Sequence, residues 1–202
     1  MAHVSTALFI IDVQNDFTEG GSLGVDGGGA VAVGVARLVR EHPDRYDQVF
    51  ASRDWHDKGN DNGGHFSDVP DFVDTWPVHC VAHTAGAEYH PALELPARVI
   101  HVRKGQGAPA YSIFEGITEE GESVPDALNR LRVTDIDVAG IATDYCVLAS
   151  ALDAIAASRH VRVLSDLVAG VSSASSSAAL KRLAASGATV VGSALVDMPG
   201  RD

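Results

Sequence analysis

Cysteine, basic residues and long apolar runs are scarce in this sequence, and each shortage excludes a class of protein. The chain has two cysteines, Cys80 and Cys146, so a disulfide framework is excluded and a reducing compartment is expected. With 15 Lys and Arg against 27 Asp and Glu, the formal net charge is −12, which disfavours binding to a phosphate backbone. No stretch reaches the roughly 18 apolar residues of a membrane span, and no basic region precedes the first apolar run as in a signal peptide. We therefore predict a soluble, cytoplasmic protein that binds neither nucleic acid nor membranes.

The remaining composition is that of an ordinary globular protein. Hydrophobic residues make up 46% of the chain and charged residues 21%, which is typical of folded rather than disordered proteins. A length of 202 residues allows one sizeable core. Because neither a linker nor an internal repeat divides the sequence, we predict a single domain over residues 1–202.

Short apolar runs rich in β-branched residues alternate with segments of helical period. Continuous apolar strands that alternate with helices indicate a parallel sheet buried on both faces. We therefore predict a doubly wound α/β fold, with a mainly parallel sheet and helices on both faces. The predicted strands are 7–13, 47–52, 97–102, 135–140, 161–166 and 188–192, and the predicted helices are 30–42, 123–132, 144–158 and 175–187.

One long segment, residues 53–96, has no clear period and is rich in Gly, Asp, His and Pro. Loops of this length are uncommon in compact domains unless they are functional. The segment holds Asp54, His56, His65 and His79, and imidazoles with a carboxylate are ligands that a divalent transition metal prefers. In an extended chain Asp54 and His56 point to the same side, so both can reach one ion. The spacing alone leaves open whether the metal is structural, activates water or holds a substrate.

Four polar residues follow the ends of predicted strands. Asp12 closes the first strand, Asp54 follows the second, Lys104 the third and Cys146 the fourth. Ligands of open parallel sheets bind at the carboxyl ends of the strands, so four such residues at one edge predict a functional site.

Cys146 is the candidate nucleophile of this predicted site. It lies where a strand passes into a helix, and the positive end of the helix dipole favours a thiolate there. Asp12 can act as its base and Lys104 as its charge partner. A buried, inert cysteine is the alternative. We interpret Cys80, which follows His79, as structural.

Seven short motifs together resemble the nicotinamidase/pyrazinamidase family of the isochorismatase-like cysteine hydrolases. The resemblance extends from about residue 6 to residue 193. The motifs are IIDVQNDF (10–17), SRDWH (52–56), HF (65–66), WPVHC (76–80), RKG (103–105), YSIFEG (111–116) and GIATDYCV (140–147).

The resemblance implies a role for each matching residue. It implies a catalytic triad and a metal site at the strand ends and in segment 53–96, an oxyanion hole formed by backbone N–H groups beside a cis peptide bond, and a pocket for a pyridine ring. An Asn- and Gly-rich insertion between His56 and His65 departs from the family pattern and leaves the fourth metal ligand open. The implied residues are Cys146, Asp12 and Lys104 for the triad; Asp54, His56 and His79, with His65 as the fourth, for the metal; Ala142 and Cys146 for the oxyanion hole, after the cis bond Ile141–Ala142; and Phe17, Trp76, Tyr111 and Ile141 for the pocket.

The implied function is deamidation of nicotinamide to nicotinate and ammonia through a thioester on Cys146, with pyrazinamide as an analogue substrate. The implied cofactor is one divalent metal ion, with zinc as first choice and iron or manganese as alternatives. Three other functions stay open: hydrolysis by a metal-bound hydroxide, hydrolysis of another small amide by the same fold, and non-catalytic binding of a metal or ligand. A homo-oligomer paired through an exposed edge strand is a further possibility that the sequence does not decide.

Overall fold

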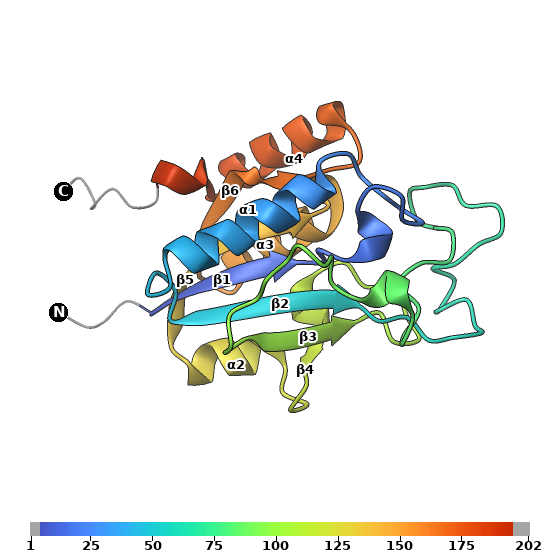
Figure 1. Ribbon diagram of the computed structural model, residues 1–202, viewed down its shortest axis with the longest axis horizontal. Helices are drawn as coiled ribbons and strands as arrows, with labels where there is room; N and C mark the ends of the chain where they lie inside the picture. Colours follow the sequence, from blue (N-terminus) through green and yellow to red (C-terminus); the bar gives the residue numbers. More distant parts are fainter. Residues whose placement is uncertain (1–4, 196–202) are drawn as a thin grey trace.

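The computed structural model describes residues 5–195, and these form a seven-stranded sheet with helices on both faces (Figure 1). The strand order is β4-β3-β2-β1-β5-β6-β7, and every neighbouring pair is parallel except β3 with β4. The strands are β1 (Ser5–Ile11), β2 (Gln48–Asp54), β3 (Ile100–Lys104), β4 (Ile117–Thr118), β5 (Val133–Ile141), β6 (His160–Ala169) and β7 (Thr189–Val191). The α-helices are α1 (Gly28–Glu41), α2 (Val124–Arg130), α3 (Leu148–Ala156) and α4 (Ser173–Ala185). The predicted doubly wound α/β fold is confirmed.

The central strand β1 shows why both faces of the sheet are covered. Its alternate side chains point to opposite faces, and all are fully buried from position 7 to 11. Phe9 and Ile11 belong to a core that also contains side chains of α2, α3 and α4. Leu8 and Ile10 belong to the other core, which contains the apolar stripe of α1. Burial on both sides explains the continuous apolar run that the sequence shows.

Several boundaries differ from the sequence-based expectations, and the predicted strand 97–102 is shifted to Ile100–Lys104, so Lys104 ends β3 instead of following it. β1 ends at Ile11 rather than residue 13, because Asp12 adopts a left-handed conformation with φ of 48° and turns the chain out of the sheet. The antiparallel edge strand β4 was not predicted, because two residues are too few to show a period. The predicted helix 144–158 begins with a π-helical turn, Thr143–Val147, before α3. Turns of this kind are frequent at functional sites.

The segment predicted to be irregular is irregular from residue 55 onward, whereas Arg53 and Asp54 end β2. Isolated bridges, such as His56 with Val81, tie it together. Most of it lies beyond the carboxyl ends of β2 and β3, and its last part runs back along the sheet toward the start of β3 (Figure 1), where Leu93 packs in the core on the α1 side. Within residues 5–195, no helix has both the length and the hydropathy that crossing a bilayer requires.

Candidate active site and metal centre

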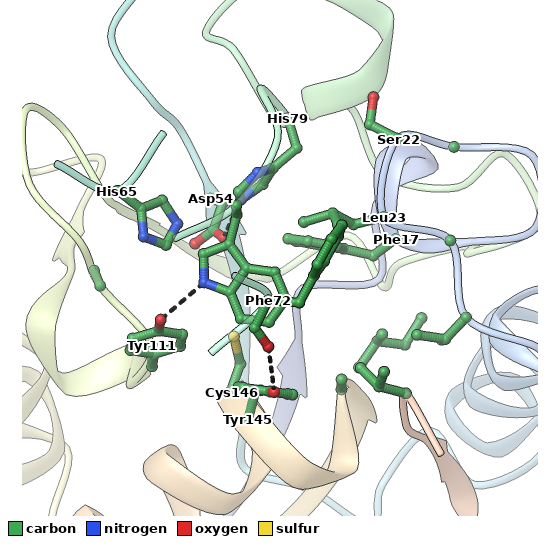
Figure 2. Close-up of a pocket in the computed structure, with 18 of the residues that line it drawn as sticks. Phe17, Ser22, Leu23, Asp54, His65, Phe72, His79, Tyr111, Tyr145 and Cys146 are labelled. Carbon is green, nitrogen blue, oxygen red and sulfur yellow. Dashed lines mark hydrogen bonds and ion pairs between the residues drawn. The ribbon is translucent and has the colours of Figure 1, made fainter. Parts of the chain in front are cut away.

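A cavity of about 530 Å³ opens at the carboxyl edge of the sheet (Figure 2). Cys146 lines it from the π-helical turn, and Asp54 lines it from the end of β2. His65 and His79, from the irregular segment, line it as well. The sulfur and three of the four predicted metal ligands therefore face one space, as Figure 2 shows, although they come from segments far apart in the sequence.

Lys104 contacts the other three polar residues that were predicted at the strand ends, namely Asp12, Asp54 and Cys146. Its Nζ lies 2.9 Å from Oδ2 of Asp12 and 3.7 Å from Sγ of Cys146. It also donates to Oδ1 of Asp54 and, at 3.3 Å, to the carbonyl oxygen of Ala110. The side chains of Asp12 and Lys104 are fully buried. The predicted cation thus contacts both the predicted nucleophile and the predicted base, which places a proton acceptor near the sulfur.

Burial has the largest effect on the pKa of the sulfur. Burial raises the pKa of the Cys146 thiol well above its usual range; Lys104 opposes this shift and Asp12 adds to it. Desolvation therefore acts against the thiolate that the strand-to-helix position is predicted to favour, and that expectation stays a prediction. Burial also raises the pKa of Asp12, against the effect of Lys104. A thiol beside a carboxylate of raised pKa needs a proton transfer before it can attack.

Asp54 and Lys104 keep their charges. Burial acts to raise the pKa of Asp54, but the Lys104 ammonium and the neighbouring imidazoles of His56 and His79 outweigh it, so the pKa lies well below its usual range. Burial acts to lower the pKa of Lys104, but the carboxylates of Asp12 and Asp54 hold it well above its usual range. The centre of the site is a buried ion-pair network.

Ser52 fixes the orientation of Asp12. Its hydroxyl donates to Oδ1 of Asp12 at 2.6 Å and accepts from the backbone N–H of Asp12 at 3.3 Å. Both residues are fully buried. Since Oδ1 is held by Ser52, Oδ2 is the oxygen that faces Lys104. Sequence reasoning missed Ser52, because nothing in the sequence around a serine inside a predicted strand indicates that its hydroxyl bonds to Asp12.

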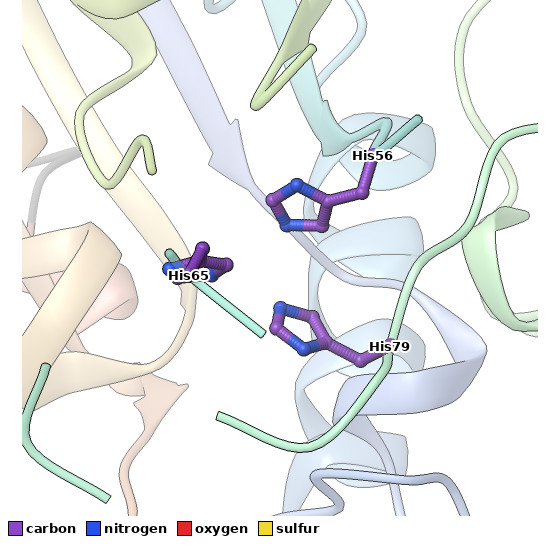
Figure 3. A group of neighbouring side chains, drawn as sticks. All are labelled: His56, His65 and His79. Atoms are coloured by element: carbon purple, nitrogen blue, oxygen red, sulfur yellow. The ribbon is translucent and has the colours of Figure 1, made fainter. Parts of the chain in front are cut away.

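Three histidines form a cluster beside this network (Figure 3). His56, His65 and His79 each offer one ring nitrogen, and these three atoms lie within 4.8 Å of one another. Oδ2 of Asp54 lies 3.7 Å from Nε2 of His56 and 3.8 Å from Nε2 of His79. All four residues predicted as metal ligands are therefore neighbours.

The buried ring nitrogens fit a metal ion. Among the described residues, Nε2 of His56 and Nδ1 of His65 are buried without a hydrogen-bond partner. Such atoms are rare unless an ion or water satisfies them. The Nδ1 atoms of His56 and His79 lie 2.8 Å from the carbonyl oxygens of Gly105 and Pro77. A backbone carbonyl on one ring nitrogen leaves the other free to bind a metal, which is the usual support of histidine ligands.

Asn62 explains how His65 reaches the cluster despite the insertion. Its side chain is fully buried. Oδ1 accepts from the backbone N–H of Asp57 at 2.8 Å and of Gly107 at 3.2 Å, and Nδ2 donates to the carbonyl of Asp57 at 3.1 Å. The added residues therefore fold back on themselves. Burial lowers the pKa of His65 to about 4, which keeps its ring in the neutral form that binds metals.

Gly105 allows His56 to occupy its position, and this predicts the effect of a substitution. Gly105 has φ of 83°, and a Cβ added there would lie 2.6 Å from Cε1 of His56. We expect Gly105→Ala to displace the imidazole and weaken zinc binding by about 10- to 100-fold, the usual effect of disturbing a ligand's support. Competition with a chromogenic chelator measures this affinity.

Gly59 provides the matched control for this variant. Its φ is 82°, and a Cβ there meets nothing within 4 Å. Gly59→Ala carries the same backbone penalty, of order 1 kcal/mol, without the contact to His56. Equal zinc affinities of the Gly105→Ala and Gly59→Ala proteins would show that His56 does not depend on the space beside Gly105.

The predicted pocket residues all line the cavity: Phe17, Trp76, Tyr111, Ile141 and Ala142. The peptide bond Ile141–Ala142 is cis, as the resemblance implied. Nε1 of Trp76 donates to the hydroxyl of Tyr111 at 3.0 Å.

Sequence reasoning missed several further residues of the cavity wall, among them Leu23, Phe72 and Tyr145. The ring of Tyr145 packs edge-on against Trp76 at 5.0 Å, and its hydroxyl donates to the carbonyl oxygen of Phe72 at 3.3 Å (Figure 2). Tyr145 immediately precedes the predicted nucleophile, and that position was the available signal. Phe72 and Leu23 lie in irregular segments, in which no sequence pattern indicates a pocket residue.

Comparisons with known proteins agree with this arrangement. Residues 6–194 match the family described as "Isochorismatase domain". The nicotinamidase/pyrazinamidase of Mycobacterium tuberculosis is 46% identical over 177 residues, which are 88% of this chain and 93% of that protein.

Several solved structures share the fold at more than 25% identity, and two of them hold a metal or a ligand. The pyrazinamidase of Pyrococcus horikoshii in complex with zinc superposes with a TM-score of 0.80 at 31% identity, covering 93% of this chain and 99% of that one. An L. infantum protein in complex with nicotinate superposes with a TM-score of 0.80 at 30% identity, covering 95% and 94%. The family match over nearly the whole chain, together with these likenesses, shows that the chain belongs to the isochorismatase family.

Proposed function

We propose that this protein is a metal-dependent amidohydrolase that deamidates nicotinamide to nicotinate and ammonia through a thioester on Cys146. The single observation that carries the proposal is that the sulfur of Cys146 lines one cavity together with His65 and His79, two members of the cluster of three histidines. Relatives named nicotinamidase and a related structure that holds nicotinate support this choice of substrate. Pyrazinamide has the same ring shape and carboxamide and is the expected analogue.

The reaction uses contacts that the resting site already contains. Asp12 takes the proton of the Cys146 thiol, and Lys104 stabilises the thiolate that forms. The sulfur attacks the carboxamide carbon, and the backbone N–H groups of Ala142 and Cys146 stabilise the oxyanion, a contribution of about 10²–10³ in rate per donor. Asp12 then gives its proton to the leaving nitrogen, and ammonia departs.

Hydrolysis of the thioester completes the cycle. Asp12, again a carboxylate, takes a proton from a water molecule that attacks the thioester carbon. The tetrahedral adduct collapses, the C–S bond breaks, and the sulfur regains a proton from Asp12. Nicotinate leaves, and the thiol and carboxylate are restored.

The residues proposed to hold the metal are Asp54, His56, His65 and His79. A set of three imidazoles and one carboxylate without a thiolate suits zinc, with iron or manganese as alternatives. When bound, the metal supplies a Lewis acid that binds the ring nitrogen of the substrate and so orients the carboxamide toward Cys146. Aromatic side chains around it, among them Phe17 and Tyr111, select a flat ring and exclude water.

Two alternatives to this mechanism keep the same cavity. A metal-bound hydroxide could attack the amide directly, and the contact of Cys146 with Lys104 favours the thiolate instead. Another small amide could be the substrate, and the histidine cluster favours a substrate with a ring nitrogen. A non-catalytic binding protein has no need of Asp12, Lys104 and Cys146 in contact.

Ammonia release from nicotinamide tests the proposal. We expect the zinc-loaded protein to release one ammonia per nicotinate formed, to lose activity when a chelator removes the metal, and to regain it when zinc is restored. Parallel assays with iron and manganese identify the preferred metal. Absence of ammonia release from nicotinamide and pyrazinamide by the zinc-, iron- and manganese-loaded proteins alike would contradict the proposal.

Several sequence-based expectations stay predictions. These are a single domain over residues 1–202, part of which lies outside the described residues; a cytoplasmic location; no binding to nucleic acid or membranes; and the possibility of a homo-oligomer.

A further inference from the structure

The side chain of Gln14 makes three hydrogen bonds to backbone groups beside the site. It lies two residues after Asp12 and is fully buried. Its Oε1 accepts from the backbone N–H of Asp54 at 2.8 Å. Its Nε2 donates to the carbonyl oxygen of Asp54 at 2.9 Å and to that of Ala87 at 2.9 Å. The carboxamide thus pairs with both backbone groups of Asp54, as a neighbouring strand would.

This pairing continues the sheet where its own ladder has ended. The β1–β2 ladder runs as far as Ile10 with Ala51. Beyond it, Asp12 turns away with φ of 48°. On the β1 side, Asp54 is therefore held by the side chain of Gln14, whereas on the other side it pairs with Lys104 of β3. The Gln14 carboxamide takes the place of the missing strand.

Asp54 is the residue whose position matters most to both halves of the site. Its Oδ1 accepts from Lys104, which contacts Cys146, and its Oδ2 faces Nε2 of His56 and of His79. A shift of Asp54 would disturb the ion-pair network and the histidine cluster together. Groups that hold a metal-binding residue in place strongly affect metal affinity.

We infer that Gln14 is a positioning residue, which sets the carboxylate of Asp54 between Lys104 and the histidines and thereby supports metal binding. This inference rests on the proposed function, because that function assigns Asp54 to the metal. Gln14 itself touches neither the sulfur nor the histidine cluster through any described hydrogen bond.

Replacing Gln14 by methionine, which keeps its length, tests the inference. We expect Gln14→Met to weaken zinc binding by about 10- to 100-fold in chelator competition, and to lower kcat/KM at saturating zinc. A merely structural role would lower the free energy of unfolding and leave the zinc affinity of the folded protein unchanged. A zinc affinity within about two-fold of the wild type would overturn the inference.

Tyr46→Phe is the matched control. It removes a single hydrogen bond, from the Tyr46 hydroxyl to Oδ2 of Asp137 at 2.8 Å, to a fully buried residue outside the cavity. We expect the control to lose stability and keep its zinc affinity. If Tyr46→Phe weakened zinc binding as much as Gln14→Met, a general loss of stability would explain both effects, and the inference would fail.

Hydrogen exchange of the wild-type protein tests the role of Gln14 even if Gln14→Met does not fold. The Asp54 amide, bonded to Gln14, is expected to exchange far more slowly than that of Gly59, which lies in an exposed turn. Zinc is expected to slow it further, because a bound ion stabilises the closed state. An Asp54 amide that exchanges as fast as Gly59, or is unaffected by zinc, would refute the inference. These binding and exchange measurements stand whether or not nicotinamide is the substrate.

Discussion

Cys146→Ala is expected to abolish turnover while the metal content stays that of the wild type. The sulfur forms the bond that splits the reaction into two steps, and loss of a nucleophile that acts with its base costs up to about 10⁶ in kcat. Cys146 contacts Lys104 at 3.7 Å, and no described contact joins it to the histidine cluster. We therefore expect kcat/KM for nicotinamide to fall by at least about 10⁴. Ammonia assays and metal analysis of the same preparation measure both quantities.

Cys80→Ala is the control for this variant. Cys80 is also fully buried, but it lies in a separate small cluster with Trp55 and Ala87 and does not line the cavity. We expect this control to keep activity within a few-fold and to lose some stability. If Cys146→Ala instead kept most of its turnover, attack by a metal-bound hydroxide would replace the thioester mechanism.

Lys104→Met is expected to destabilise the metal-free protein by about 3–5 kcal/mol and to remove most of the activity. The ammonium lies in full burial between Asp12, at 2.9 Å, and Asp54. Without it, two buried carboxylates lie close together with no cation. Removing only one partner of a buried ion pair is strongly destabilising, because the remaining charge is buried and uncompensated. Denaturant unfolding in the presence of a chelator gives the free energy of unfolding, and ammonia release gives the activity.

Two companion variants separate the buried charge from a general effect of losing a lysine. Lys181→Met, on the exposed side of α4, should change stability by less than about 0.5 kcal/mol. Adding Asp12→Asn to Lys104→Met should recover part of the lost stability, because one unpaired carboxylate is removed. If Lys104→Met lowered the free energy of unfolding by less than about 1 kcal/mol, the loss would be no larger than that of a solvent-exposed ion pair. This result would contradict a buried ion-pair network.

The parts of the fold that the sequence predicted are those with a repeating local signal. Apolar runs such as Leu8 to Ile11 carry that signal, since strands buried on both faces need apolar residues at every position. The two-residue strand β4 and the π-helical turn carry no such signal. Their formation depends on contacts made only after the sheet has assembled.

For the site, the sequence by itself determined which residues are available and at which strand ends they stand. Asp54 and Lys104 stand at the carboxyl ends of neighbouring strands. In a parallel sheet these ends lie at one edge, so the two residues are brought to the same edge by the chain order. Only the tertiary structure decided that Asp54 contacts Lys104 and the histidine cluster at once, that the side chain of Gln14 bonds to its backbone, and that burial raises the pKa of Cys146. The physical reason is that hydrogen-bond partners and desolvation depend on distances between segments that are far apart in the chain, and local patterns do not encode these distances.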